Sequence, residues 1–293
     1  MILWNNIQSI FKKGSIISKL IYINLAIFVL IALVNIVAFL FNSPQITEKV
    51  VKALAVPSSL PTLIKRPWTI ITYMFTHEGF WHILFNMLWL GWFGKIFTEF
   101  LSQRDLLPTY ILGGLWGAIL YILSFNVFPA FTDSVNSSIA IGASAAVMGV
   151  IFAISCYVPN YEINLVFFGR VKIIWIAIIV LILTSFANFS INTGGKLAHI
   201  GGALYGYYFA TKQKQGKTVG VWVNKTIDWL VSLLRPRQKM KTHYRKPRND
   251  FEYNSRKAEE QAEINRILDK ISKGGYDCLT KEEKDRLFKE SQK

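Results

Sequence analysis

The sequence predicts an all-α membrane protein: a bundle of six transmembrane helices followed by a small cytoplasmic helical module. Two observations predict this class. Of the 293 residues, 52% are apolar, and the mean hydropathy is +0.32, which a soluble domain of ordinary composition would not reach. The chain also contains long stretches without Asp, Glu, Lys or Arg. Crossing a bilayer as a helix takes about 20 mostly apolar residues, so these stretches suit membrane spans.

Six such uncharged stretches are the predicted spans. They cover residues 20–47, 79–94, 106–132, 134–161, 173–195 and 197–211. The shorter stretches can still span, because flanking lysines reach the polar surface. The first stretch could belong to a signal peptide, but it is too long and lacks a small-residue cleavage pattern. We therefore expect a membrane domain at residues 18–212, preceded by a cytoplasmic segment at residues 1–17.

The distribution of basic residues predicts the orientation. Eleven Lys and Arg lie between residues 212 and 248, opposed only by Asp228, which places this end in the cytoplasm. Six spans then place the N-terminus there too. Three lysines agree, Lys12, Lys13 and Lys19, whereas four basic residues of the long first loop disagree, Lys49, Lys52, Lys65 and Arg66. We expect an integral, multi-pass protein of a bacterial-type plasma membrane, with both termini cytoplasmic.

Beyond the spans, residues 213–250 predict an amphipathic helix and a basic linker. The helix places six apolar residues on one stripe, Val219, Trp222, Val223, Trp229, Leu230 and Leu233. Lys225 and Asp228 interrupt it, so it should lie in the lipid interface and not cross the bilayer.

Residues 251–293 predict a cytoplasmic helical hairpin. One helix carries an apolar stripe of Ile264, Ile267, Leu268 and Ile271 and ends at Gly274 and Gly275; a second opens with the capping box "TKEE" at residues 280–283. This module has ten basic and ten acidic residues, so the net charge of +15 belongs to the rest of the chain. Basic residues beside a membrane usually hold anionic lipid, which argues against a nucleic-acid partner. The partner of the module stays open.

Polar side chains gather near the starts of the second, fourth and sixth spans. The second opens "HEGFWHILFN", with His77, His82 and Asn86; the fourth contains "IGASAAVMG", with Ser144; the sixth contains "LAHIGGALYG", with His199. With the N-terminus inside, all three spans start on the outer side, so these residues share one depth. Ionisable groups within a membrane mark candidate functional sites.

This combination predicts nucleophilic catalysis. A serine hydroxyl becomes nucleophilic when a neutral imidazole takes its proton, which suits Ser144 and His199. His82 and Asn86, four residues apart on one helix face, can donate hydrogen bonds to the tetrahedral intermediate. Close helix approach would be allowed by four glycines, Gly142, Gly201, Gly202 and Gly206.

The motifs "HEGFWHILFN", "GAS" and "AHIGGALYG" resemble, in order and spacing, those of the rhomboid family of intramembrane serine proteases. The resemblance covers roughly residues 18–212. It implies six helices around a water-filled cavity, a Ser144–His199 dyad without an acid, and an oxyanion hole of His82, Asn86 and the Ser144 amide. It also implies a first loop, at residues 41–68, that lies partly in the outer leaflet.

The implied activity is cofactor-free endopeptidase cleavage of transmembrane segments, near the outer leaflet, in single-span or polytopic membrane proteins. The chain departs from many members in two places. Ala145 replaces a glycine, and Met148 replaces an aromatic residue that would pack against the histidine. Both departures bear on turnover rate more than on mechanism.

Other interpretations remain open. Ser144 alone would more often be a helix-packing residue, and His77 could line or support the outer rim. A zinc site is disfavoured, because His77 and His82 are five residues apart, whereas His-Glu-x-x-His needs four. The principal alternative is a catalytically silent relative that binds membrane clients. A transporter is disfavoured, because the polar groups gather on one side of the membrane.

Overall fold

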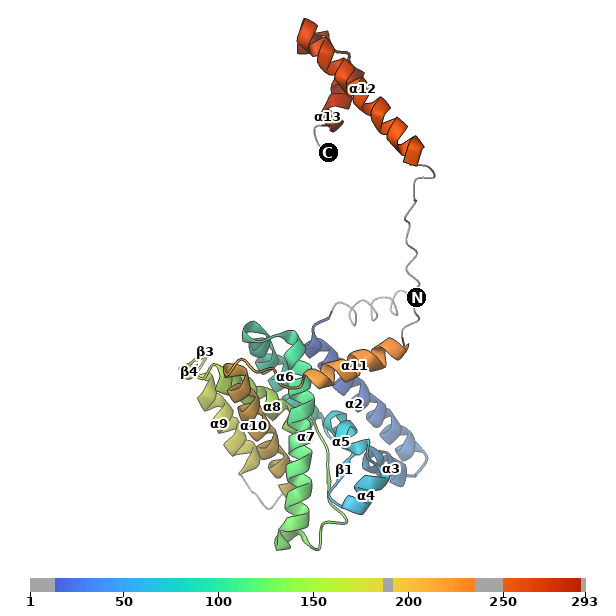
Figure 1. Cartoon of the computed structure of the whole chain (residues 1–293). Helices are drawn as coiled ribbons and strands as arrows, with labels where there is room; N and C mark the ends of the chain where they lie inside the picture. Colours follow the sequence, from blue (N-terminus) through green and yellow to red (C-terminus); the bar gives the residue numbers. More distant parts are fainter. Residues whose placement is uncertain (1–13, 187–191, 235–249, 291–293) are drawn as a thin grey trace. The chain divides into compact units, whose positions relative to one another are not determined.

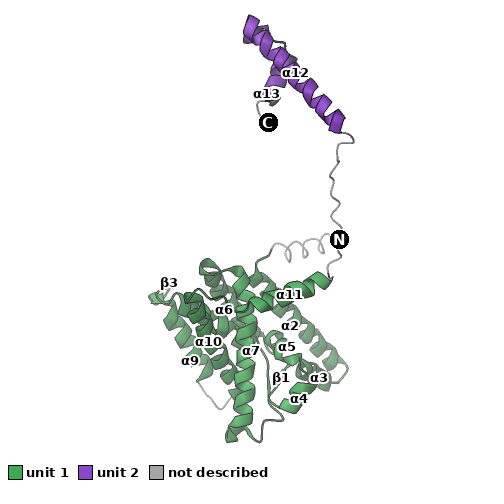
Figure 2. Cartoon of the chain, viewed as in Figure 1, with its two compact units in different colours: residues 1–235 green, residues 236–293 purple. Residues whose placement is uncertain are grey.

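A computed structural model of the chain describes residues 14–186, 192–234 and 250–290. The chain divides into two compact units, residues 1–235 and residues 236–293 (Figure 2). Most of the predicted N-terminal segment and the basic linker lie outside the described residues.

The first unit is helical, as predicted, with two short β-ladders (Figure 1). Its elements in chain order are α2 (Ile16–Leu40), α3 (Gln45–Leu54), β1 (Val56–Pro57), α4 (Leu60–Lys65), α5 (Thr69–Thr72), η1 (Tyr73–Phe75), α6 (Phe80–Phe100), α7 (Gln103–Val127), η2 (Pro129–Phe131), β2 (Ile139–Ala140), α8 (Ser144–Tyr157), β3 (Glu162–Leu165), β4 (Gly169–Lys172), α9 (Ile173–Ser185), α10 (Thr193–Lys214) and α11 (Val221–Leu234). Within the described residues, α2 and α7 are long and apolar enough to cross a membrane, and α8 and α9 are shorter apolar helices. The six predicted spans correspond to α2, α6, α7, α8, α9 and α10, and their number stays a prediction.

The fourth predicted span was wrong in its start. Uncharged sequence begins at Ser134, but α8 begins at Ser144. The preceding residues are held in an irregular segment, where β2 pairs antiparallel with β1 and the Ser58 hydroxyl donates to the Val135 carbonyl at 2.7 Å. With 14 residues, α8 is about 21 Å long, shorter than the hydrocarbon core of about 30 Å. Its first residue can therefore lie inside the bundle.

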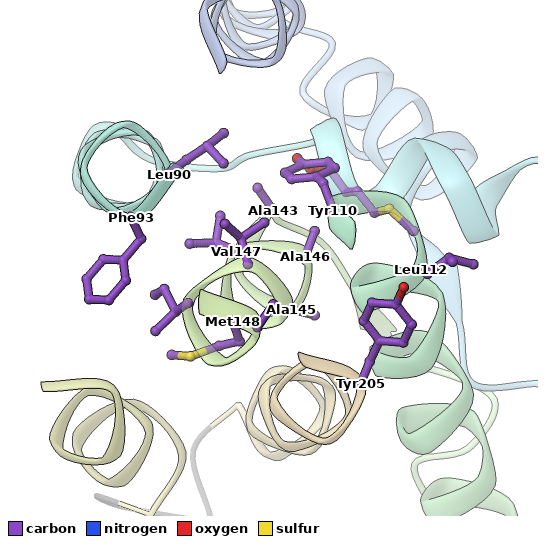
Figure 3. Close-up of a cluster of buried hydrophobic side chains, with 14 of the residues drawn as sticks. Leu90, Phe93, Tyr110, Leu112, Ala143, Ala145, Ala146, Val147, Met148 and Tyr205 are labelled. Atoms are coloured by element: carbon purple, nitrogen blue, oxygen red, sulfur yellow. The ribbon is translucent and has the colours of Figure 1, made fainter. Parts of the chain in front are cut away.

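Helix α8 forms the centre of the first unit. Most of its side chains are buried, and Figure 3 shows α6, α7 and α10 around it. Leu90 and Phe93 of α6 approach from one side, and Tyr110 of α7 and Tyr205 of α10 from the other. Helix α8 is consequently held by packing from three neighbouring helices.

The first loop is ordered into short helices, which composition alone did not predict. Trp68 Nε1 donates to the Ala53 carbonyl at 2.9 Å, and Thr72 Oγ1 donates to the Leu54 carbonyl at 2.7 Å. These bonds tie α3 to the segment that enters α6. The depth of the first loop in the outer leaflet stays a prediction.

The predicted amphipathic helix is present as α11. Val223 is buried, and Asn224 Nδ2 donates to the carbonyl of Arg104 in α7 at 2.7 Å. Trp222 and Trp229 are exposed. The helix is thus fixed to the start of α7 on one side, and its location in the lipid interface stays a prediction.

The second unit contains α12 (Asp250–Gly274), η3 (Tyr276–Cys278) and α13 (Lys281–Glu290). The predicted capping box is confirmed, because the Thr280 amide donates to Glu283 Oε2 at 2.9 Å and the Glu283 amide to Thr280 Oγ1 at 3.4 Å. Lys270 also bonds the Glu283 carboxylate, and together these bonds lower the pKa of Glu283 to about 2. Of the predicted apolar stripe of α12, Ile267 is buried but Leu268 is exposed. Consecutive residues project about 100° apart around a helix, so Leu268 does not share the buried side of Ile267.

Candidate active site

The structure brings Ser144 and His199 together. Ser144 Oγ lies 2.7 Å from His199 Nε2, which is hydrogen-bonding distance for a hydroxyl and an imidazole. Ser144 is the first residue of α8, and His199 lies in the second turn of α10. Both are partly buried. Two residues 55 positions apart in the chain thus form one pair.

Glycines allow this pairing, as predicted for α10. A Cβ atom added at Gly202 would overlap the Ala145 carbonyl oxygen, and one at Gly206 would lie 2.5 Å from the Gly149 carbonyl oxygen. Gly201 approaches α7 in the same way, with the Trp116 carbonyl oxygen 2.6 Å from the added atom. Larger residues at these positions would push α10 away from α7 and α8.

The role predicted for Gly142 was wrong. This glycine lies in the segment before α8, not at a helix crossing, with φ of +113°. An added Cβ would lie 2.7 Å from Cε1 and Nε2 of His82. Only glycine suits a position that combines such a backbone angle with so close a ring. Gly142 thereby lets the chain pass beside the His82 imidazole.

A cavity of about 350 Å³ is lined both by the predicted catalytic pair and by the predicted oxyanion-hole side chains. Ser144, His199, His82 and Asn86 all line it, together with Met148. Asn86 is 6% exposed, and its Nδ2 donates to the His82 carbonyl at 2.8 Å, one turn back on α6. An amide nitrogen has two hydrogens, so a second donor remains available. The polar residues that were predicted to share one depth in the membrane thus line one cavity.

Aromatic residues of the cavity wall were not identified from the sequence. Trp81, Phe85 and Trp89 line it from α6, and Val180 and Thr184 line it from α9. The three aromatic residues are spaced four apart, so they follow one face of α6. Trp81 and Phe85 each precede a predicted site residue, His82 and Asn86, and share their spacing of four. This pattern in the sequence could have identified them as neighbours of the site.

His77 lies beneath the start of α8 and is fully buried. Its Nε2 accepts a hydrogen bond from the Ala143 amide at 3.2 Å, and its ring contacts that of His82 edge-on, with centroids 5.1 Å apart. Ala143 is the N-cap of α8 and offers no side-chain cap. His77 therefore contacts the backbone that carries Ser144, and it also lines a second cavity with Asn35 and Thr47. Its role as a rim or a support residue stays a prediction.

The uncapped start of α8 leaves backbone donors free of helical partners. The first amides of any helix lack intrahelical acceptors, and they carry the positive end of the helix dipole. Here the Ser144 amide is the first of them, beside a cavity lined by His82 and Asn86. Such a helix start is suited to binding an anionic oxygen.

Ala145 is accommodated by α7. Its Cβ lies 2.6 Å from the position that a Cβ would have on Gly117. The extra methyl relative to glycine therefore occupies space that Gly117 leaves empty. Met148, 4% exposed, lies one turn beyond Ser144 at the cavity wall.

Comparison with known proteins agrees with the motifs. The rhomboid domain family matches residues 65–214, which is half of the chain and includes every residue of the site. The chain belongs to the rhomboid family. As a rhomboid it is a membrane-embedded protein. The match begins after α2 and most of the first loop, so it covers less of the N-terminal part than the expected residues 18–212.

Individual relatives are distant. The chain is 26% identical over 165 residues to "Rhomboid protein 1, mitochondrial" of Saccharomyces cerevisiae, a match that covers 53% of this chain and 46% of the relative. It is 25% identical over 142 residues to "RHOMBOID-like protein 5" of Arabidopsis thaliana, a match that covers 48% of this chain and 42% of the relative. It is 28% identical over 160 residues to "Rhomboid-related protein 1" of Caenorhabditis elegans, a match that covers 51% of this chain and 40% of the relative. The chain spans less than half the length of these three relatives. Residues 249–293 match a family of unknown function, DUF6576.

Proposed function

We propose that this rhomboid is an intramembrane serine endopeptidase that cleaves transmembrane segments of other membrane proteins near the outer leaflet. The observation that carries the proposal is the 2.7 Å contact between Ser144 Oγ and His199 Nε2 at the wall of a cavity. A serine that only packed helices together would not need an imidazole at this distance. Membership in a family of which the members are generally intramembrane serine proteases supports the same conclusion.

In the proposed acylation step, Ser144 is the nucleophile and His199 the general base. Neutral His199, with its proton on Nδ1, accepts the hydroxyl proton at Nε2 while Oγ bonds to the carbonyl carbon of the substrate. The tetrahedral intermediate then collapses. Its C–N bond breaks, His199 returns the proton to the leaving amine, and an ester remains on Ser144.

The negative oxygen of that intermediate would be bound by the donors around the cavity. We assign this role to the Ser144 amide, the free hydrogen of the Asn86 amide group, and His82. Removing one such donor in a soluble protease costs about 100-fold or more in kcat. Sharing the charge among three donors should reduce the cost of losing any one of them.

In the proposed deacylation step, a water molecule attacks the ester and His199 accepts its proton. The C–Oγ bond breaks, the proton passes to Ser144 Oγ, and the carboxyl product leaves. Among the described residues that line the cavity, none is acidic. The proposed machinery is therefore a dyad, in which packing and not a carboxylate orients the imidazole.

The cavity wall suits an apolar substrate. Trp81, Phe85 and Trp89 offer large apolar surfaces beside the polar pair. We propose that extended segments of single-span or polytopic membrane proteins bind there. The proposal includes six spans, supported by the uncharged stretches, and cytoplasmic termini, supported by the distribution of basic residues. It also places the protein in a bacterial-type plasma membrane.

Labelling and cleavage together test this proposal. A fluorophosphonate should label purified protein at Ser144, and cleavage of a single-span reporter substrate should be abolished in Ser144→Ala and in His199→Ala, with unchanged thermal unfolding. Chelators should not alter the rate. A folded wild-type protein that neither labels nor cleaves would instead support the silent, client-binding alternative, and labelling at another serine would reassign the nucleophile.

A further inference from the structure

The connection between α8 and α9 ends in an exposed apolar tip that the proposed chemistry does not use. Strands β3 and β4 pair in register from Glu162 with Lys172 to Leu165 with Gly169, which leaves a three-residue tip, Val166–Phe168. Val166 is 93% exposed and Phe167 is 90% exposed, more than any other large apolar side chain among the described residues. Adjacent apolar residues with this exposure usually mark a contact surface.

The hairpin that carries this tip is fixed to the bundle. Ile163, Leu165 and Val171, on its inward face, pack against the hydrophobic core. At its base the Tyr161 ring contacts Phe100 at the end of α6, with centroids 5.2 Å apart, and the Tyr161 carbonyl accepts from the amide that opens α9 at 2.8 Å. The tip is therefore held outward by packing, so its exposure is a property of the fold.

The position of the hairpin identifies what it meets. It follows the end of α8 opposite Ser144, and in Figure 1 it lies at the edge of the bundle, at the end where α7 and α9 begin. That end faces the cytoplasmic leaflet in the proposed topology. A membrane-embedded protein has lipid around its edge at this level, so the nearest apolar phase is the leaflet itself.

Charges around the tip suit an anionic leaflet. Arg170 and Lys172 follow the tip and Glu162 precedes it, so the hairpin carries a net charge of +1. Lys214, the last residue of α10, adds a further cation at the end of the bundle where α7 and α9 begin. Apolar side chains flanked by basic residues are typical of segments that enter the headgroup region of anionic membranes.

We propose that the Val166–Phe168 tip inserts into the cytoplasmic leaflet and that the basic residues beside it bind anionic headgroups. The hairpin then acts as a lipid anchor for the α8–α9 connection, which precedes the helix that contributes Val180 and Thr184 to the cavity. This inference rests on the proposed topology of the membrane unit but not on catalysis.

Depth-dependent quenching tests the proposal. In full-length protein with Cys156→Ala and Cys278→Ser, a single cysteine in place of Phe167 would carry an environment-sensitive nitrobenzoxadiazole label. The protein would be placed in nanodiscs of mixed phosphatidylcholine and phosphatidylglycerol. A matched label at Lys257, an exposed residue of α12 in the second unit, serves as the aqueous control.

We expect the label at position 167 to be blue-shifted, quenched several-fold more by acyl-chain doxyl lipids than the control, and shielded from aqueous iodide. Raising the phosphatidylglycerol fraction should increase the doxyl quenching. Iodide quenching equal to that of the control would overturn the proposal, and so would shielding from both quenchers, which would indicate a second copy of the chain on the tip. Ser144→Ala should give the same quenching, so an inactive protein and a water-exposed tip are distinguishable.

Discussion

Replacing Gly202 by alanine should separate Ser144 from His199 without changing any group that takes part in the proposed chemistry. The new methyl would overlap the Ala145 carbonyl oxygen, which belongs to the backbone and cannot rotate away. Restoring van der Waals contact requires α10 to move from α8 by on the order of 1 Å. Because Ser144 lies on α8 and His199 on α10, their 2.7 Å contact should lengthen beyond hydrogen-bonding distance.

The expected loss in kcat/KM for Gly202→Ala is roughly 100-fold, the cost of misplacing a catalytic group by about 1 Å. Overpacking should also lower stability by about 1–3 kcal/mol, partly offset by the gain of up to about 1 kcal/mol that alanine offers over glycine within a helix. Cleavage of the reporter substrate in liposomes measures the first effect, and thermal unfolding in detergent measures the second.

Gly91→Ala is the matched control. Gly91 lies within α6, and a Cβ added there would meet only Ile21 Cδ1, at an ordinary 3.8 Å. This variant should keep full activity and equal or higher stability. If Gly202→Ala cleaved as fast as Gly91→Ala, the close approach of α8 and α10 would not be what holds Ser144 and His199 together.

Three further outcomes are expected. Asn86→Ala should lower kcat by roughly 10- to 100-fold with little change in KM, because the bond to the oxyanion strengthens in the transition state. Fluorophosphonate labelling of Ser144 should persist in this variant. Lowered stability with unchanged kcat would make Asn86 a structural amide. A chain ending at Arg248 should cleave at a comparable rate in detergent, because the removed residues belong to the second compact unit; loss of activity in a folded protein would contradict this. Carboxyl-carbon NMR should give Glu283 a pKa near 2. Its contribution to hairpin stability is then complete above its unfolded pKa of about 4.3 and is lost as the pH falls toward 2. A midpoint at the unfolded value would mean that the bonds from Lys270 and Thr280 do not persist in solution.

The sequence by itself determined the polar residues of the candidate site but not the aromatic residues of the cavity wall. Uncharged stretches located the helices, and the parity of the spans indicated that His82, Asn86, Ser144 and His199 share one depth. Helix positions, spacing and capping could be predicted because they are local properties of the chain, whereas the common depth in the membrane stays a prediction. The capping box at Thr280 is confirmed for the same reason, since donor and acceptor lie three residues apart.

Only the tertiary structure decided how the site is assembled. Charge-free sequence could not reveal that α8 starts at Ser144, because the preceding segment is held by contacts with Ser58 and Val56, far away in the chain. Nor could it show that Gly142 makes room for an imidazole and that His77 binds the backbone ahead of the serine. Each of these depends on which distant groups meet at atomic distance, and that is set by the packing of α8 against its neighbours and not by any local pattern.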